Sequence, residues 1–162
     1  MSSRSPDKKS NEPVIENRRA RHAYLIGETL ECGIELRGTE IKSVRDGQIS
    51  IAEGWVRAEA QPLSLSLHGV HIAEYPPAGP HRQHDPDRVR RLLAHKKEIR
   101  DLADQIRSRS ATIVPLKVYF LRGRAKILIG VGLGKKKADK RQDLAKRDAQ
   151  RDMDRAMSRR RS

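Results

Sequence analysis

Apolar and polar side chains alternate between His22 and Leu36. The apolar residues on one side of this pattern are Tyr24, Ile26, Leu30, Cys32, Ile34 and Leu36. A period of two over this length predicts one long strand with one buried face. Gly27 and Gly33 fall inside the strand, where glycines allow a sharp bend.

Four more strands and two helices are expected. The strands are predicted at residues 49–60, 63–72, 113–120 and 125–133. A short helix is predicted from Gly38 to Asp46-Gly47. The main helix is predicted to begin at Asp85-Pro86, because an acidic cap before a first-turn proline is typical of a helix start, and to run to about Ser108. Its apolar face would consist of Leu92, Leu93, Ile99, Leu102, Ala103 and Ile106.

Three strands, a helix and two strands, with a bent first strand, follow the order of the OB-fold. We therefore predict a mainly β protein in which residues 16–133 form a small closed OB-type barrel. The main helix would lie between the third and fourth strands, and the short helix after the first. Residues 1–15 are predicted to be a disordered leader, since 1–13 are polar and lack the apolar stretch of a secretory signal.

Residues 134–162 form a separate basic C-terminal tail, predicted to be disordered or helical. It holds twelve Lys or Arg and five Asp, a net +7 that is half of the charge of the whole chain, +14. It has no aromatic residue and too few large apolar residues for a core. Such a tail is typical of a segment that lies along a polyanion, and the overall charge favours nucleic acid over an anionic membrane surface.

Composition excludes several other classes of protein. No apolar run approaches the roughly 20 residues that cross a bilayer. Cys32 is the only cysteine, which excludes an internal disulfide and a cysteine-clustered zinc site and favours a reducing, cytoplasmic compartment. One Phe, one Trp and three Tyr are few for a protein that stacks bases on aromatic rings. We therefore expect contacts to the phosphates, 2′-hydroxyls and shape of a folded RNA.

Several polar groups have both an ordinary and a functional interpretation. The basic run at residues 17–22 fits a solvated leader, but together with the basic and hydroxyl groups of the short helix it suits phosphate and sugar contacts. His81 and His84 are more typical of a loop than of a metal site, and Cys32 of a buried filler than of a nucleophile. Arginines 88, 90 and 91 at the predicted helix start are either solvated or in contact with RNA. Lys126 is either a solubility device or an RNA contact. No catalytic constellation stands out, so we predict neither enzyme activity nor a cofactor.

Four segments occur in order along the chain: NRRARHAY at 17–24, GTEIKSVR at 38–45, DPDRVRRLL at 85–93 and GKKKADKR at 134–141. Together they resemble the SmpB family, the SsrA-binding proteins of bacterial trans-translation. The resemblance implies an OB-type barrel that binds the elbow of the tRNA-like domain of tmRNA, with no enzyme activity and no cofactor. The implied partners are tmRNA, the decoding centre and mRNA channel of the stalled ribosome, and EF-Tu through the charged tmRNA.

The resemblance also implies two sets of contact residues. The RNA-binding set is Asn17, Arg19, Arg21, His22, Glu31, Lys42, Ser43, Arg45, Leu93 and Lys126. The ribosome-contacting tail set is Gly134, Lys135, Lys136, Asp139, Lys140 and Arg141. In the family this tail is disordered when free and helical in the empty mRNA channel, and Asp139 is expected to cap or orient the start of that helix.

The chain departs from the family pattern at two positions. Ala138 stands where relatives often have a His or Tyr ring, so a stacking role does not transfer to it. Leu133 stands where relatives often have Lys or Arg. Two rival functions remain open: a general ribosome-associated basic OB protein without preference for tmRNA, and a hydrolase that uses the histidines.

Overall fold

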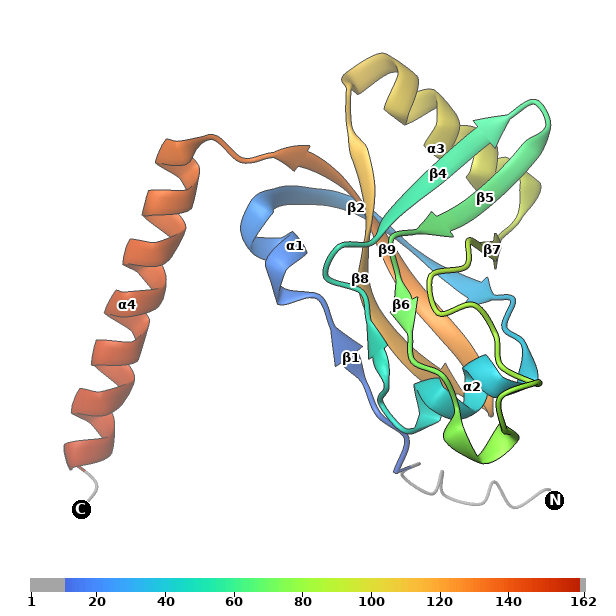
Figure 1. Cartoon of the computed structure of the whole chain (residues 1–162). Helices are drawn as coiled ribbons and strands as arrows, with labels where there is room; N and C mark the ends of the chain where they lie inside the picture. Colours follow the sequence, from blue (N-terminus) through green and yellow to red (C-terminus); the bar gives the residue numbers. More distant parts are fainter. Residues whose placement is uncertain (1–10, 161–162) are drawn as a thin grey trace, which may run out of the picture.

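The computed structural model describes residues 11–160, drawn in Figure 1. In chain order the elements are β1 (Ile15–Glu16), α1 (Arg18–Ala23), β2 (Tyr24–Ile34), α2 (Gly38–Arg45), β3 (Ile49–Ser50), β4 (Trp55–Ala60), β5 (Leu63–His68), β6 (His71–Ile72), the 3-10 helix η1 (Pro76–Ala78), β7 (Arg90–Leu93), α3 (Lys96–Arg109), β8 (Thr112–Leu121), β9 (Arg124–Gly134) and α4 (Lys137–Arg160). The prediction of a mainly β protein is confirmed. Of the predicted leader, residues 1–10 lie outside the described part, and Ile15 already pairs with Val118 of β8.

The strands of the main sheet follow one another in the order β1-β8-β4-β5-β7-β2-β9, and β9 also pairs with β8. The pairing of β9, the last strand in this order, with β8, the second, therefore joins six strands from β8 to β9 in a continuous ring of pairings. Strands β3 and β6 pair separately. In the pairing of β2 with β9 the register shifts between Ile26 and Thr29, which is where Gly27 predicts a bend.

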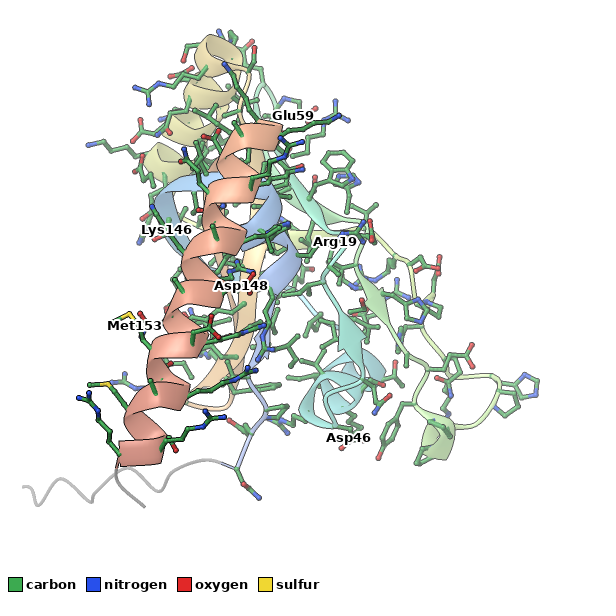
Figure 2. All side chains as sticks on the ribbon, turned by 90° about the vertical axis from the view of Figure 1, so that its left-hand side faces the viewer. Arg19, Asp46, Glu59, Lys146, Asp148 and Met153 are labelled. Carbon is green, nitrogen blue, oxygen red and sulfur yellow. The ribbon has the colours of Figure 1, made fainter. Side chains whose placement is uncertain are left out.

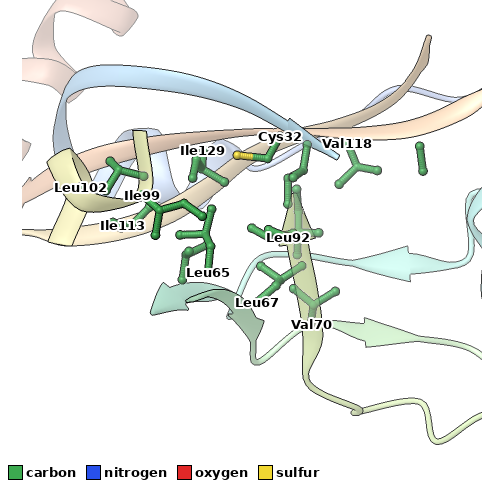
Figure 3. Close-up of a cluster of buried hydrophobic side chains, with 14 of the residues drawn as sticks. Cys32, Leu65, Leu67, Val70, Leu92, Ile99, Leu102, Ile113, Val118 and Ile129 are labelled. Carbon is green, nitrogen blue, oxygen red and sulfur yellow. The ribbon is translucent and has the colours of Figure 1, made fainter. Parts of the chain in front are cut away.

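Most buried apolar side chains of the strands form one core (Figure 3). Tyr24 and Ile26 of β2 instead pack against a second cluster of Ala20, Val114 and Leu116, so the strand changes its buried face at the register shift. Cys32 of β2, Leu65 and Leu67 of β5, and Ile127 and Ile129 of β9 are all at most 1% exposed. Helix α3 packs on β4 and β5 and contributes Ile99 and Leu102 to the same core. The interpretation of Cys32 as a buried filler is confirmed, and burial raises the pKa of its thiol to about 12.

The predicted start of the main helix at Asp85 is wrong. The Asp85 carboxylate accepts a hydrogen bond from the backbone N–H of Asp87 at 3.0 Å and so closes a turn. The next residues form β7, which pairs with both β5 and β2, and α3 begins only at Lys96. Aspartate before proline suits a turn as well as a helix start, and pairing with two strands distant in sequence decides between them.

Two predicted strands are each divided in the structure. The strand at 49–60 becomes β3 and β4, separated by a turn in which Gly54 N–H donates to the Ile51 carbonyl at 3.0 Å. The strand at 63–72 becomes β5 and β6, separated at Gly69, whose φ of +68° lies in the left-handed region that favours glycine. The buried positions change phase at both breaks, from Ile51 to Val56 and from Leu65 and Leu67 to Val70 and Ile72. This change of phase in the alternation was a sequence signal for each break.

A buried carboxylate connects α2 to the segment before β7. Glu40 is fully buried, and its carboxylate accepts hydrogen bonds from Arg88 at 2.7 and 3.1 Å and from Arg90 at 3.0 Å. Arg90, also fully buried, donates further to the carbonyls of Val70 at 2.7 Å and Pro86 at 2.9 Å. Arg90 is therefore a structural residue, and neither a solvated nor an RNA-facing placement of its side chain is correct.

Burial alone would raise the pKa of Glu40, but hydrogen bonds from Arg88, from the backbone N–H of Arg37 and from Arg90 outweigh it and lower the pKa to about 2. A carboxyl group whose pKa is lowered by folding stabilises the protein above its unfolded pKa. This contribution is present above the ordinary value of 4.5 and is lost as the pH falls from there towards about 2.

We predict that Glu40→Gln lowers the free energy of unfolding at neutral pH by about 3–5 kcal/mol, because it leaves the guanidinium of Arg90 buried without a counter-charge. Urea unfolding measures the loss. The difference from wild type should shrink as the pH falls from 4.5 towards about 2, because wild-type Glu40 then also becomes neutral.

The matched control is Asp104→Asn, which breaks the exposed ion pair between Asp104 and Arg107. Exposed pairs contribute little, so this change should alter stability by less than about 1 kcal/mol. An equal loss in both variants, or a Glu40→Gln loss that is independent of pH, would contradict the assigned role.

Candidate RNA interface

The outer face of the sheet brings four residues into one row. Leu93 of β7 pairs with Gly33 of β2, Gly33 with Lys126 of β9, and Lys126 with Tyr119 of β8. A Cβ atom on Gly33 would lie 3.4 Å from the Cβ of Leu93, so the missing side chain leaves room for Leu93. Leu93 is 51% exposed, which leaves an apolar side chain on the surface beside a lysine.

Glu31 lies on the same face, two residues before Gly33. Its carboxylate accepts a hydrogen bond from the hydroxyl of Tyr119. Burial and this hydrogen bond raise the pKa of Tyr119 to about 12, which keeps the hydroxyl protonated as a donor. The Lys117 ammonium lies 5.0 Å from the centroid of the Tyr119 ring. The Glu31 carboxylate is therefore a hydrogen-bond acceptor that Tyr119 holds in one orientation, on a surface that is basic and partly apolar.

Helix α2 adds basic groups, one of them at the turn between β8 and β9. The Arg45 guanidinium donates to the Gly123 carbonyl at 3.3 Å and lies 5.5 Å from the centroid of the Phe120 ring. Lys42 is exposed, and its ammonium lies 5.4 Å from the centroid of the Tyr75 ring. Arg45 therefore lies by the end of the hairpin that contains Lys126, whereas Lys42 lies beside Tyr75.

Two predicted contact residues are buried. Ser43 is 1% exposed, and its hydroxyl has no hydrogen-bond partner among residues 11–160. Asn17 is 3% exposed, and its side-chain amide donates to the carbonyls of Ile51 at 3.1 Å and Pro115 at 2.9 Å. The structure thus does not bring either side chain to the exposed face of the sheet.

Asn17 explains the form of the basic run at 17–22. Its side-chain oxygen accepts from the backbone N–H of Ala20 at 3.0 Å, which caps the start of α1. The run is consequently a short helix rather than an extended entry to β2. Arg19 forms an ion pair with Glu53, Arg21 is exposed, and His22 is partly buried with its Nδ1 unpaired among the described residues.

The tail begins against α1. The Lys135 ammonium donates to the Arg21 carbonyl at 3.0 Å and pairs with the carboxylate of Asp143 in α4. The backbone N–H of Lys135 donates to the Ala23 carbonyl at 3.0 Å. Only 7% of the Lys135 side chain is exposed, so this lysine anchors the start of the tail to α1 in addition to contributing a positive charge.

Helix α4 continues from this anchor away from the strands (Figures 1 and 2). The Asp139 carboxylate, in the first turn of α4, accepts from the backbone N–H of Lys136 at 3.3 Å, which is consistent with the expected role of Asp139 at the helix start. Lys136, Lys140 and Arg141 surround this helix start, and from Leu144 to Arg160 every residue is exposed. The tail is helical in the structure of the chain without any partner. This differs from the expectation that the tail is disordered when free and becomes helical only in the mRNA channel. Good helix formers and pairs such as Gln150 with Asp154, 3.0 Å apart, favour the helix.

The predicted RNA-binding residues therefore fall into two groups. Glu31, Leu93 and Lys126 lie on the sheet face, Arg45 lies at the turn between β8 and β9, and Lys42 lies on the same helix as Arg45. Arg19, Arg21 and His22 lie on α1 beside the start of the tail. The sequence did not predict the roles of two residues near these groups, Tyr119 and Lys135. Tyr119 had a signal, because it alternates with buried Val118 and Phe120 on β8. The anchoring role of Lys135 had none, because its partners are a backbone carbonyl and a distant turn of α4.

The histidines do not form a metal site. His84 is 3% exposed, with Nδ1 2.9 Å from the Thr39 hydroxyl and Nε2 3.0 Å from the Ile72 carbonyl. Residues 11–160 contain no group of three His, Cys, Asp or Glu side chains placed to hold a metal ion. Within the same range, none of the helices is both long and apolar enough to cross a membrane.

A mainly β body with basic groups on its outer face, joined to a long basic helix, defines an RNA-binding protein. The sequence profile of the SmpB protein family matches residues 14–159. The chain belongs to the SmpB family.

Curated relatives are similar over nearly their whole length. The SsrA-binding protein of Chloroflexus aurantiacus (strain ATCC 29366 / DSM 635 / J-10-fl) is 49% identical over 146 residues, which is 90% of each chain. The SsrA-binding protein of Salinispora arenicola (strain CNS-205) is 49% identical over 155 residues, which is 96% of each chain. A chain in a solved structure described as "tmRNA-SmpB: a journey to the center of the bacterial ribosome" has a TM-score of 0.63 and 47% identity, and the match covers 77% of this chain and 86% of that one.

We predict that Asp143→Asn loosens α4 from α1, because a neutral amide forms no ion pair with Lys135. Spin labels at Met153→Cys and Arg100→Cys report the distance between α4 and α3, and the buried thiol of Cys32 does not compete for label. The distance distribution should be broader in the variant than in wild type.

Asp148→Asn is the matched control, since it removes the same charge from an exposed position of the same helix (Figure 2). It should leave the distribution unchanged, and circular dichroism should show equal helix content in all three proteins. Broadening in both variants would mean that the pair with Lys135 does not set the position of the tail.

Proposed function

We propose that this chain is an adaptor that binds the tRNA-like domain of tmRNA and delivers it to stalled ribosomes for trans-translation, that is, for ribosome rescue and peptide tagging. The observation that carries the proposal is the registered row of Leu93, Gly33, Lys126 and Tyr119, with Glu31 beside it, in a chain of the SmpB family. The row and Glu31 together offer an apolar, a cationic and an acceptor group on one rigid face.

Each group of this surface suits one part of a folded RNA. Lys126 and Arg45 neutralise phosphates, and Leu93 packs on a ribose or base that leaves the helical stack. Glu31 accepts from a base N–H or a 2′-hydroxyl, donors that the elbow of a tRNA-like fold exposes. The hydrogen bond from Tyr119 fixes the direction of the carboxylate, so binding costs little ordering of this side chain.

We infer that the strands form a closed barrel of OB type. The return of the pairings from β9 to β8 supports closure, and α3 between β7 and β8 is consistent with the single main helix of that fold. A closed barrel holds its outer face in fixed curvature, which suits recognition by shape.

We infer further that the tail enters the empty mRNA channel near the decoding centre through Gly134, Lys135, Lys136, Asp139, Lys140 and Arg141. The exposed basic groups around the helix start support this role. Ala138 offers no ring for stacking, so the contact is electrostatic at this position. EF-Tu is expected to join through the charged tmRNA, the cytoplasm is the site of action, and the chain acts without a catalytic step or a cofactor.

The rival function is general binding to ribosomal RNA. Selectivity for a tRNA-like elbow over a plain duplex of equal length separates the two. The proposed surface predicts selectivity, because Glu31 repels phosphates unless a specific donor faces it.

We predict that Glu31→Ala weakens binding to the tRNA-like domain about tenfold or more, although it raises the net positive charge, because a hydrogen bond to a charged acceptor is lost. Filter binding or fluorescence anisotropy measures the affinity. Glu35→Ala is the matched control: it removes an acid just beyond the same strand and should leave affinity equal or slightly higher. Tighter binding by Glu31→Ala would refute the acceptor role.

We also predict that combined Asp139→Ala, Lys140→Ala and Arg141→Ala abolishes peptide tagging while binding to the tRNA-like domain stays near wild type. The triple variant Arg147→Ala, Asp148→Ala and Arg151→Ala changes the net charge equally further along α4 and should retain most of the tagging. Loss of tRNA-like domain binding in the first variant would show that the barrel and the tail do not divide the work as proposed.

A further inference from the structure

The only tryptophan of the chain lies on the surface. Trp55 is 44% exposed, and one face of its ring stacks on His68 at a centroid distance of 4.3 Å and an interplanar angle of 11°. The two residues are directly opposed on β4 and β5. An exposed aromatic ring of this size is unexpected in a chain with so few aromatic residues.

The Trp55 ring is held in place by the ring of His68 and by the turn that follows it. His68 Nε2 lies 3.0 Å from the Ser66 hydroxyl, which orients the imidazole. Gly69 follows at once with φ +68°, and a Cβ atom there would lie 2.5 Å from the carbonyl oxygen of Glu53. The turn before Trp55 and the turn after His68 are thus in contact, and the aromatic pair is pre-organised.

Trp55 also lines a groove between the start of β4 and α1. Arg19 and Tyr24 come from the α1 side, and Glu53 and Thr112 complete the wall near Trp55. The side chains of Arg19 and Glu53, which form an ion pair, are 67% and 69% exposed. The pair is therefore weak, and Arg19 can exchange Glu53 for another anion. Next to this groove on the sheet face, Arg57, Ser66 and Arg91 form a row across β4, β5 and β7.

We propose that this groove binds an unpaired RNA nucleobase, stacked on Trp55, with its phosphate at Arg19. A rigid indole beside exchangeable arginines combines the two features of single-strand RNA sites, a stacking surface and a cation for the backbone. The inference extends the proposed function by a second RNA contact that is distinct from the Glu31, Leu93 and Lys126 surface. Glu53 competes with the phosphate for Arg19 and so limits the affinity of the groove.

Because Trp55 is the only tryptophan, intrinsic fluorescence reports this groove alone. The full-length protein is titrated with an adenylate hexamer and with an abasic hexamer that has the same phosphates. Both bind the basic tail by charge, but only the adenylate should quench Trp55 saturably, since only it has bases to stack. Equal responses to both hexamers would overturn the proposal.

Affinity measured by anisotropy of labelled hexamers gives a second readout. Trp55→Leu should weaken adenylate binding at least about fivefold and remove the preference over the abasic hexamer, whereas Trp55→Phe keeps a ring and should keep the preference. Glu53→Gln should tighten adenylate binding, because it frees Arg19 and removes a repelling charge. Thermal unfolding checks that each surface variant is folded. A preference that survives in Trp55→Leu would overturn the proposal.

Binding of the tRNA-like domain is measured on the same proteins. In Trp55→Leu it should remain within about threefold of wild type, because the Glu31 surface is intact. Retained domain binding with loss of the hexamer preference supports a separate groove. Loss of both in parallel would show that Trp55 belongs to the domain-binding surface and would overturn the second contact, while failure of the wild type to bind the domain would count against the proposed function alone.

Discussion

The carboxylate of Glu40 sets the position of the segments that present the proposed RNA surface. It lies fully buried between Arg88 and Arg90, and Arg90 in turn holds the carbonyls of Val70 and Pro86. A desolvated charge is tolerated only with all of its partners in place, so α2, β7 and the segment before β7 cannot shift independently. Because α2 holds Arg45 and β7 ends at Leu93, the interior ion pair fixes the spacing of groups at the surface.

The two contact regions are built in different ways. On the sheet face, strand register alone brings Leu93, Lys126 and Tyr119 together, so their geometry is as rigid as the sheet. At α1, a helix of six residues is capped by buried Asn17 and holds the tail through Lys135. Here position depends on a few side-chain hydrogen bonds, which makes this region the easier one to displace. A rigid surface for RNA shape and a displaceable arm for a channel are consistent with an adaptor that meets two partners in turn.

The regular elements were predictable where a pattern is local. Period-two alternation predicted β2, β8 and β9, and the turn residues predicted α2. The start of α3 was not predictable, since 85–93 reads equally as a helix start or as a turn and strand, and pairing with β2 and β5 decides. The resemblance to the family indicated Asn17 and Ser43 together with Lys126, because a resemblance does not distinguish a residue that contacts a partner from one that supports it. Trp55 gave no signal, because its stacking on His68 depends on the register of two strands.

Because the start of α4 is anchored on α1, the length of the helix sets how far its tip extends from the body of the protein. Its 24 residues span about 36 Å at 1.5 Å per residue, measured from a point that Lys135 fixes on α1. Substitutions along the exposed faces of this helix change its charge but not its reach. One inserted or deleted residue would move every later side chain by about 1.5 Å and turn it by about 100° around the axis. A change in the length of α4 therefore displaces all later side chains at once, whereas a substitution changes one side chain and leaves the positions of the others unchanged.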